Sequence, residues 1–290
     1  MIDSDQLSLA LTERFGLDVV TKAEQIAEGL KIIIRPRDIE YTISFQVEII
    51  LGWRTISAIF KPGNFAVSLV KNMKSATMEQ KAAFAVFAGS LKSKGAKVLL
   101  TMDGNEVDPL NPEIWPSEWS VIKITMKKTG IIIESDSSYD FRATFPWATG
   151  FFGMSLALLP LEQIREEISI GEVEGASYYS LVKHYERSRI NRAACIEIKG
   201  ADCAACGFNF GAIFGSLGEG YIHIHHIVPV SQLGPNYVIN PGTDLIPLCP
   251  NCHAMIHRRN PPLTLSEIFD IIIYEKEPIA ADGKPNYKCS

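Results

Sequence analysis

Hydrophobic positions in the first half of the chain alternate between helical and extended spacing, which predicts a mixed α and β structure. In the segment 78–95, apolar residues recur three and four positions apart up to Gly95, the pattern of an amphipathic helix. A further helix is expected over 4–29, before Gly29. Apolar, β-branched runs predict strands over 31–35, 41–51, 55–60, 96–102, 120–126 and 131–135.

The longest uncharged apolar run, FPWATGFFGMSLALLPL, covers residues 145–161. It is interrupted by Gly150, Gly153 and Pro160, and it is shorter than the roughly 20 apolar residues that a membrane span needs. The run therefore predicts a buried helix and no membrane segment.

The pattern changes at REEISIGEVEGAS, residues 165–177, which is acidic, contains two glycines and has no clear period. We expect a domain boundary there, between an α+β domain over 1–168 and a second domain over 177–275. The second domain is expected to begin with a basic helix over 178–200. Three arginines cluster in that helix: Arg187, Arg189 and Arg192.

The net charge of −5 argues against a protein that coats nucleic acid non-specifically, but the charge is unevenly distributed. Residues 1–176 carry 18 Lys and Arg against 23 Asp and Glu, whereas residues 177–260 carry 7 against 5. The N-terminus has acids where a secretion signal would have lysines, so we expect a cytoplasmic protein. In that reducing compartment, paired cysteines are better interpreted as metal ligands than as disulfides.

Two CxxC pairs lie in the basic segment, Cys203 with Cys206 and Cys249 with Cys252. A CxxC at a tight turn presents two thiolates to one ion, and two such turns complete a tetrahedral zinc site. Four thiolates leave no coordination position open, so this zinc is expected to be structural. The alternative is four buried free thiols.

Histidines concentrate in the same segment. In the strand-like stretch YIHIHHIVPV, side-chain alternation puts His223 and His225 on one face and turns His226 to the other. In CHAMIHRR, His253 and His257 are four residues apart, so a helix would present both imidazoles on one face. The sequence thus offers more histidines than one closed site requires.

HIHHIVP followed by DLIPLCPNCHAMIH resembles the motif of the ββα-metal (HNH) endonucleases. With two CxxC knuckles and CGFNF after the first, residues 185–260 are similar to the McrA-like restriction endonucleases within that family. The resemblance implies a catalytic divalent ion, Mg²⁺, Mn²⁺, Ni²⁺ or Zn²⁺. It assigns ligand roles to His225, His253 and His257.

The resemblance further makes His226 the general base. It puts Asp244 at the position of the motif's central Asn, where the side chain holds the loop and orients the base. His223 departs from the family pattern, because many relatives have an acid two residues before the first of the adjacent histidines, here His225 and His226. Neutral imidazole suits proton abstraction near neutral pH, and a divalent cation stabilises the charge that develops on a phosphodiester.

These features predict a metal-dependent endonuclease that cuts double-stranded DNA, in restriction or anti-phage defence. The domain over 1–168 would decide where, when or with whom the enzyme cuts. A homodimer would be useful, because one active site of this kind cuts only one DNA strand. Five arginines are expected to contact the DNA backbone: Arg187, Arg189, Arg192, Arg258 and Arg259. The alternative is a zinc-stabilised nucleic-acid-binding module that cuts nothing.

Overall fold

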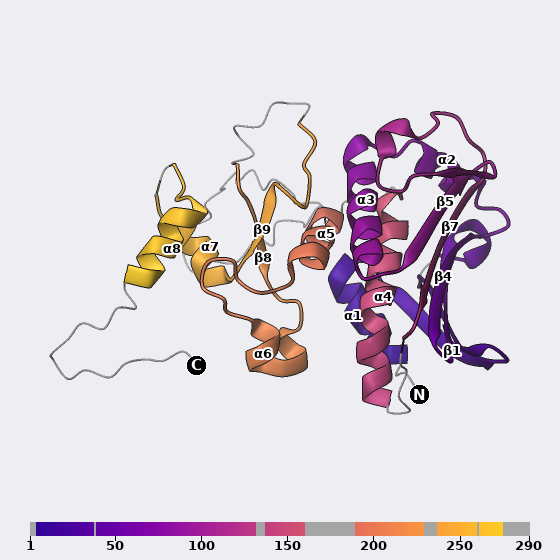
Figure 1. Cartoon of the computed structure of the whole chain (residues 1–290), viewed down its shortest axis with the longest axis horizontal. Helices are drawn as coiled ribbons and strands as arrows, with labels where there is room; N and C mark the ends of the chain where they lie inside the picture. Colours follow the sequence, from indigo (N-terminus) through magenta and orange to yellow (C-terminus); the bar gives the residue numbers. More distant parts are fainter. Residues whose placement is uncertain are drawn as a thin grey trace, which may run out of the picture. The chain divides into compact units, whose positions relative to one another are not determined.

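The computed structural model describes residues 4–37, 39–131, 137–159, 189–228, 237–259 and 261–274 (Figure 1). The chain divides into two compact units. Unit 1 comprises Met1–Ile198 with Asn236–Thr243, and unit 2 comprises Lys199–Pro235 with Asp244–Ser290. The predicted domain ends at 168 and 177 lie outside the described residues, so they stay predictions.

Unit 1 is built on a seven-stranded antiparallel sheet with the strand order β1-β2-β3-β4-β7-β5-β6. The first four strands follow one another in sequence, and β7 pairs between β4 and β5. The strands are β1 (Val19–Ile26), β2 (Gly29–Pro36), β3 (Phe45–Gly52), β4 (Thr55–Pro62), β5 (Lys97–Met102), β6 (Asn105–Val107) and β7 (Ile122–Thr129).

Helices cover one face of this sheet, and the hydrophobic core lies between them and the strands (Figure 1). The covering helices are α1 (Ser4–Phe15), α3 (Met78–Ser93) and α4 (Ser137–Ala157). The rings of Phe15 and Phe152 pack edge to face with centroids 5.6 Å apart, and Phe87 lies 6.3 Å from Phe15, so the three helices share one aromatic cluster. The remaining elements of unit 1 are α2 (Val67–Lys74), α5 (Arg189–Lys199), η1 (Tyr41–Ile43) and η2 (Pro112–Ile114).

Helix α5 is anchored to unit 1 by Glu197, whose side chain is 4 % exposed. This carboxylate accepts hydrogen bonds from Ser90 Oγ (3.0 Å) and Lys94 Nζ (2.5 Å), and it lies 3.8 Å from the Arg14 guanidinium. A carboxylate this buried is stable only when its lone pairs are satisfied, and here two helices of unit 1 supply the donors. Consequently α5, expected in the second domain, belongs to unit 1 up to Ile198.

Several sequence predictions about unit 1 are confirmed. The helix predicted over 78–95 is α3, which begins with a capping box formed by Thr77 and Gln80. The apolar run over 145–161 enters the buried helix α4, and no helix among the described residues is long and apolar enough to cross a membrane. The strand predicted over 131–135 lies almost entirely outside the described residues.

The helix predicted over 4–29 is wrong beyond Phe15. Gly16 has a φ of +64°, a left-handed conformation that ends α1, and the β-branched residues that follow enter β1. Strand β1 then pairs with β2 along its whole length. The strand predicted over 41–51 begins at Phe45, because Tyr41–Ile43 forms a short 3₁₀ turn.

Unit 2 contains a two-stranded antiparallel sheet, β8 (His223–His226) with β9 (Leu245–Leu248). Helix α7 (Pro250–Ile256) follows β9 almost directly, which gives the ββα order that the family resemblance implies. Its other elements are α6 (Phe210–Phe214), η3 (Gly215–Gly218) and α8 (Leu265–Tyr274). Both units therefore mix helices and strands, and the predicted α+β class is confirmed.

The Glu197 anchor can be tested through the tryptophans, because all four (Trp53, Trp115, Trp119 and Trp147) lie in unit 1 and report its unfolding alone. Glu197→Ala removes the buried carboxylate that accepts from Ser90 and Lys94 and lies near Arg14, so we expect the free energy of unfolding of unit 1 to fall by about 2–4 kcal/mol. Urea unfolding followed by tryptophan fluorescence measures it. The exposed control Glu113→Ala should stay within about 0.5 kcal/mol of wild type; equal shifts for both variants would contradict the anchoring role.

Candidate metal centres in unit 2

The register of β8 and β9 fixes where the clustered histidines point. His223 pairs with Leu248, His225 with Ile246 and His226 with Leu245. Because strand side chains alternate, His223 and His225 share a face and His226 faces the other way. His225 is buried at 8 % exposure, whereas His223 and His226 are half-buried.

Helix α7 brings the other two histidines to that face. Cys249 is its N-cap, and the Sγ atom accepts a hydrogen bond from the Cys252 amide at 3.4 Å. Pro250 occupies the first helical turn, where its missing N–H costs nothing. One helical turn separates His253 from His257, so both rings project from the same side of α7.

Three imidazoles converge between the strand and the helix. The ring of His225 lies 5.4 Å from that of His253 and 5.0 Å from that of His257, and the last two rings are 4.9 Å apart. One nitrogen from each ring lies within 4.8 Å of the other two. Bonds from a metal ion to imidazole nitrogen are about 2.0–2.1 Å, so small side-chain adjustments would let one ion bridge all three.

This three-histidine centre opens to solvent on one side. His225 is buried and His253 is half-buried, but His257 is exposed. An ion held by three imidazole nitrogens with one side exposed would keep coordination positions for water or another ligand. The predicted ligands are thus brought together as the sequence suggested.

His223 stands beside this group rather than in it. Its Nδ1 lies 3.5 Å from Nδ1 of His253, with the ring centroids 5.2 Å apart, yet it is outside the set of mutually close nitrogens. The sequence could not assign a role to His223. The signal was nevertheless present, since strand alternation already put it on the face of His225.

His226 and Asp244 meet at the end of the β8–β9 pair. Asp244 immediately precedes β9, and its carbonyl accepts a hydrogen bond of 2.9 Å from the amide of Ile227, the residue after His226. Both residues are half-buried. The backbone therefore holds Asp244 alongside the predicted base, although the two residues are 18 positions apart.

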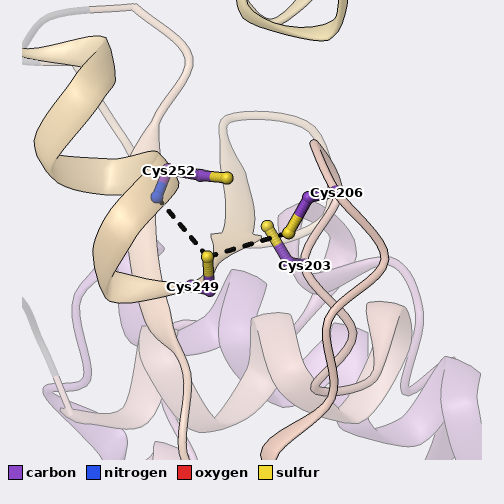
Figure 2. Close-up of side chains that lie close together, drawn as sticks. All are labelled: Cys203, Cys206, Cys249 and Cys252. Carbon is purple, nitrogen blue, oxygen red and sulfur yellow. Dashed lines mark hydrogen bonds between the residues drawn. The ribbon is translucent and has the colours of Figure 1, made fainter. Parts of the chain in front are cut away.

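Four cysteines form a second, more buried cluster (Figure 2). Each contributes an Sγ atom within 4.8 Å of the other three, and the Sγ atoms of Cys206 and Cys249 are 3.8 Å apart. With Zn–S bonds of about 2.3 Å, tetrahedral coordination puts sulfurs ~3.8 Å apart, so the spacing suits zinc. The cluster could hold a zinc ion in the manner that the sequence predicts.

Backbone hydrogen bonds shape the first knuckle and join it to the second. Gly207, with a φ of +75°, donates to the carbonyl of Cys203 at 2.8 Å and closes the turn. The amide of Ala204 donates to the carbonyl of Pro247 in β9 at 2.9 Å. The knuckle is thereby tied to the strand that leads into Cys249.

Two of the four thiols, those of Cys206 and Cys252, are poorly suited to ionise without a cation. Burial raises the pKa of Cys206 and of Cys252, and hydrogen bonding with neighbouring thiols raises the pKa of Cys252 further. Burial also acts to raise the pKa of Cys203, but backbone hydrogen bonds outweigh it and the pKa is lowered. Four thiolates in contact would repel one another, and a divalent ion removes that cost.

The predicted DNA-contacting arginines fall in different places. Arg258 and Arg259 are exposed directly after His257, and Arg259 pairs with Glu267 at 2.6 Å. Backbone hydrogen bonding at Thr264, followed by the Arg259 contact, lowers the pKa of Glu267 to about 2.

The other three arginines are not part of the described unit 2. Arg189 donates to the carbonyl of Gly16 within unit 1 (3.1 Å), and burial lowers the pKa of Arg192. Arg187 lies outside the described residues. Their contact with DNA stays a prediction.

Comparisons with known proteins address this same segment. Residues 203–259 match the family model "HNH endonuclease". Over 77 residues, the chain is 31% identical to the type IV methyl-directed restriction enzyme EcoKMcrA of Escherichia coli (strain K12). This match covers 27% of the present chain. The match spans 26% of that relative, so the chain matches about a quarter of its length. No solved structure matches.

The matched segment contains both CxxC knuckles, the β8–β9 pair and α7. Residues 203–259 therefore match the HNH endonuclease family, and the two CxxC knuckles together with the similarity to EcoKMcrA support a McrA-like classification of this segment.

Proposed function

We propose that this chain is a metal-dependent endonuclease that hydrolyses DNA phosphodiester bonds. The observation that carries the proposal is the convergence of His225, His253 and His257 on one solvent-open point, with His226 next to it on the strand. A closed structural site needs neither an open side nor an additional histidine. The HNH family match over the same residues supports this reaction class.

The two clusters would hold two metals with different tasks. Cys203, Cys206, Cys249 and Cys252 would bind a structural Zn²⁺, because soft thiolates favour it and the site is largely buried. The three histidines would bind a divalent ion, Mg²⁺, Mn²⁺, Ni²⁺ or Zn²⁺. Bound there, the ion supplies a positive charge against the scissile phosphate and the departing oxygen.

His226 would act as the general base. Its neutral imidazole can accept a proton from water near neutral pH. It is the residue after His225 in β8 and is not part of the three-histidine group, so it would serve as a base and not as a ligand of the ion. Asp244 would hold the loop and orient this imidazole. The hydrogen bond from Ile227 to the Asp244 carbonyl keeps their backbones adjacent and supports that role.

His223 would position His253. A ligating histidine commonly uses its second ring nitrogen to bond a neighbour that fixes its orientation. The 3.5 Å approach of the two Nδ1 atoms gives His253 such a neighbour, and it leaves Nε2 of His253 for the ion.

The proposed substrate is double-stranded DNA, in restriction or anti-phage defence. The name of the similar protein, a methyl-directed restriction enzyme, supports this assignment. Arg258 and Arg259 follow the site directly and would contact phosphates, with Arg187, Arg189 and Arg192 as further candidates. A homodimer would let two sites cut both strands.

The first test removes the base. His226→Ala should lower the rate of nicking of supercoiled plasmid by about 100- to 10,000-fold, because general-base catalysis contributes that much. Circular dichroism, metal content and DNA affinity should stay at wild-type values. The exposed control Ser216→Ala should cut like wild type. A His226→Ala protein that also cuts normally would favour the zinc-stabilised binding module instead.

Metal stoichiometry separates the two centres. Mass spectrometry of the purified protein should find one tightly held zinc and a second divalent ion that a chelator removes. His257→Ala should lose the labile ion and keep the zinc. Cys203→Ser should lose the zinc and unfold unit 2, while tryptophan fluorescence still reports a folded unit 1. One ion in wild type, unaffected by His257→Ala, would remove the basis for catalysis.

The positioning role of His223 predicts a partial effect. His223→Ala should weaken binding of Mn²⁺ or Ni²⁺ by about 10- to 100-fold in calorimetry, without abolishing it, because the three ligands remain. The neighbouring control Tyr221→Phe should bind as wild type does. Loss of all binding would indicate a direct ligand, and unchanged affinity would show that the His223–His253 contact is incidental.

A further inference from the structure

The sheet of unit 1 leaves one face uncovered by α1, α3 and α4 (Figure 1). We call it the open face; it consists of the outward residues of the strands. In β5, for instance, Val98, Leu100 and Met102 are buried inward, and Lys97 and Leu99 point outward. A hollow of about 410 Å³ lies near its centre, lined by residues of β3, β4, β5 and β7.

The charges on the open face have a strong sign bias. Seven outward residues are basic: Lys22, Lys31, Arg35, Lys61, Lys97, Lys123 and Lys127. Three are acidic, Glu24, Glu48 and Glu106, so the face carries seven minus three, or +4. Residues 1–176 total −5, which leaves −9 for the rest of that segment. An ordinary solvated face would carry both signs in proportion to the whole.

Two of the three acids already have partners, and the third, Glu106, lies opposite Thr101 in the edge strand β6. Glu24 pairs with Lys31 at 2.8 Å, and Glu48 pairs with Lys61 at 2.8 Å. Among the described residues, no ion pair involves Lys97, Lys123 or Lys127, and all three are exposed. The β5–β7 side of the face therefore presents uncompensated positive charge.

Lys97 and Lys127 lie directly opposite each other in the β5–β7 pair. Like charges at such positions destabilise a sheet, because the Cβ atoms are about 4.5–5.5 Å apart. Ser57, the partner of Lys127 on its other side, offers no negative charge. The Lys97–Lys127 repulsion lowers stability, and a single acidic substitution would remove it. An anion that binds between the two lysines would explain why both are present.

The cations form two rows across the strands. One row runs through Glu24, Lys31, Lys127 and Lys97, and the other contains Arg35, Lys61, Lys123 and Glu106, so each row has three cations and one acid. The rows are four residues apart along the strands, about 14 Å at 3.4 Å per residue. Between them lies a less charged row that includes Ile33, Ile59 and Leu99.

We infer that the open face binds the phosphate backbone of double-stranded DNA. Two parallel rows of cations match a ligand with two parallel lines of phosphates, and the ~14 Å between rows is comparable to the roughly 12 Å width of a major groove. Contacts of this kind position a protein on DNA without selecting a sequence. The site lies within unit 1 and gives it a binding role separate from cleavage by unit 2.

The test measures binding of the full chain to a fluorescein-labelled 30-base-pair duplex by anisotropy, without added divalent ion. K97E/K127E should weaken binding at least tenfold at 100 mM NaCl. The alanine pair K97A/K127A should reduce the slope of log affinity against log salt by about two, one for each lost phosphate contact. The control K81E/K92E changes the charge equally on α3, in the helix layer, and should stay within twofold of wild type.

Stability provides a second readout. Lys97→Glu alone replaces a repulsion with an attraction to Lys127, so its melting temperature should equal or exceed that of wild type while its DNA affinity falls. Equal losses in K97E/K127E and K81E/K92E, or no loss in K97E/K127E, would overturn the inference, as would a wild-type chain that does not bind the duplex. Wild-type binding without plasmid nicking would contradict the proposed cleavage alone.

Discussion

Cys249 is the residue on which the geometry of unit 2 depends. It ends the run from β9, caps the first turn of α7 through its Sγ atom, and contributes that same sulfur to the four-cysteine cluster. His253 and His257 lie four and eight residues after this cap, within α7 and at its end. The position of Cys249 therefore determines where both imidazoles lie. The strand pairing of β8 with β9 then sets His225 against them. The four-cysteine cluster and the three-histidine group are thus positioned through the same residue.

Burial separates the two clusters chemically. The thiols are mostly buried and tied to β9 through Ala204, so an ion among them would be enclosed by protein. The histidine group has one buried, one half-buried and one exposed ring, so an ion there would still meet solvent. A rigid closed centre beside an open one is what positioning of a reactive group requires, since small misplacements at a phosphate lower the rate steeply.

The sequence predicted unit 2 far better than unit 1, for a physical reason. Metal-ligand geometry is encoded locally, in the two-residue gaps of CxxC and the one-turn spacing of His253 and His257. The limit of α1 was missed because a single left-handed residue, Gly16, outweighs the helical pattern around it. The place of α5 was missed because its partner residues, Ser90 and Lys94, are about a hundred positions from Glu197. Contacts at that separation leave no periodic signal.

Net charge misleads for unit 1 in a similar way. A total of −5 over residues 1–176 argues against nucleic-acid binding if the charge is spread evenly, but pleating sorts side chains onto two faces. Alternation puts Lys97 and Leu99 outward, and antiparallel register then sets Lys97 opposite Lys127. Neither step is visible in composition. A polyanion responds to charges within about a Debye length, roughly 10 Å in 0.1 M salt. Its binding therefore depends on the net charge of the face that it contacts more than on the net charge of the whole chain.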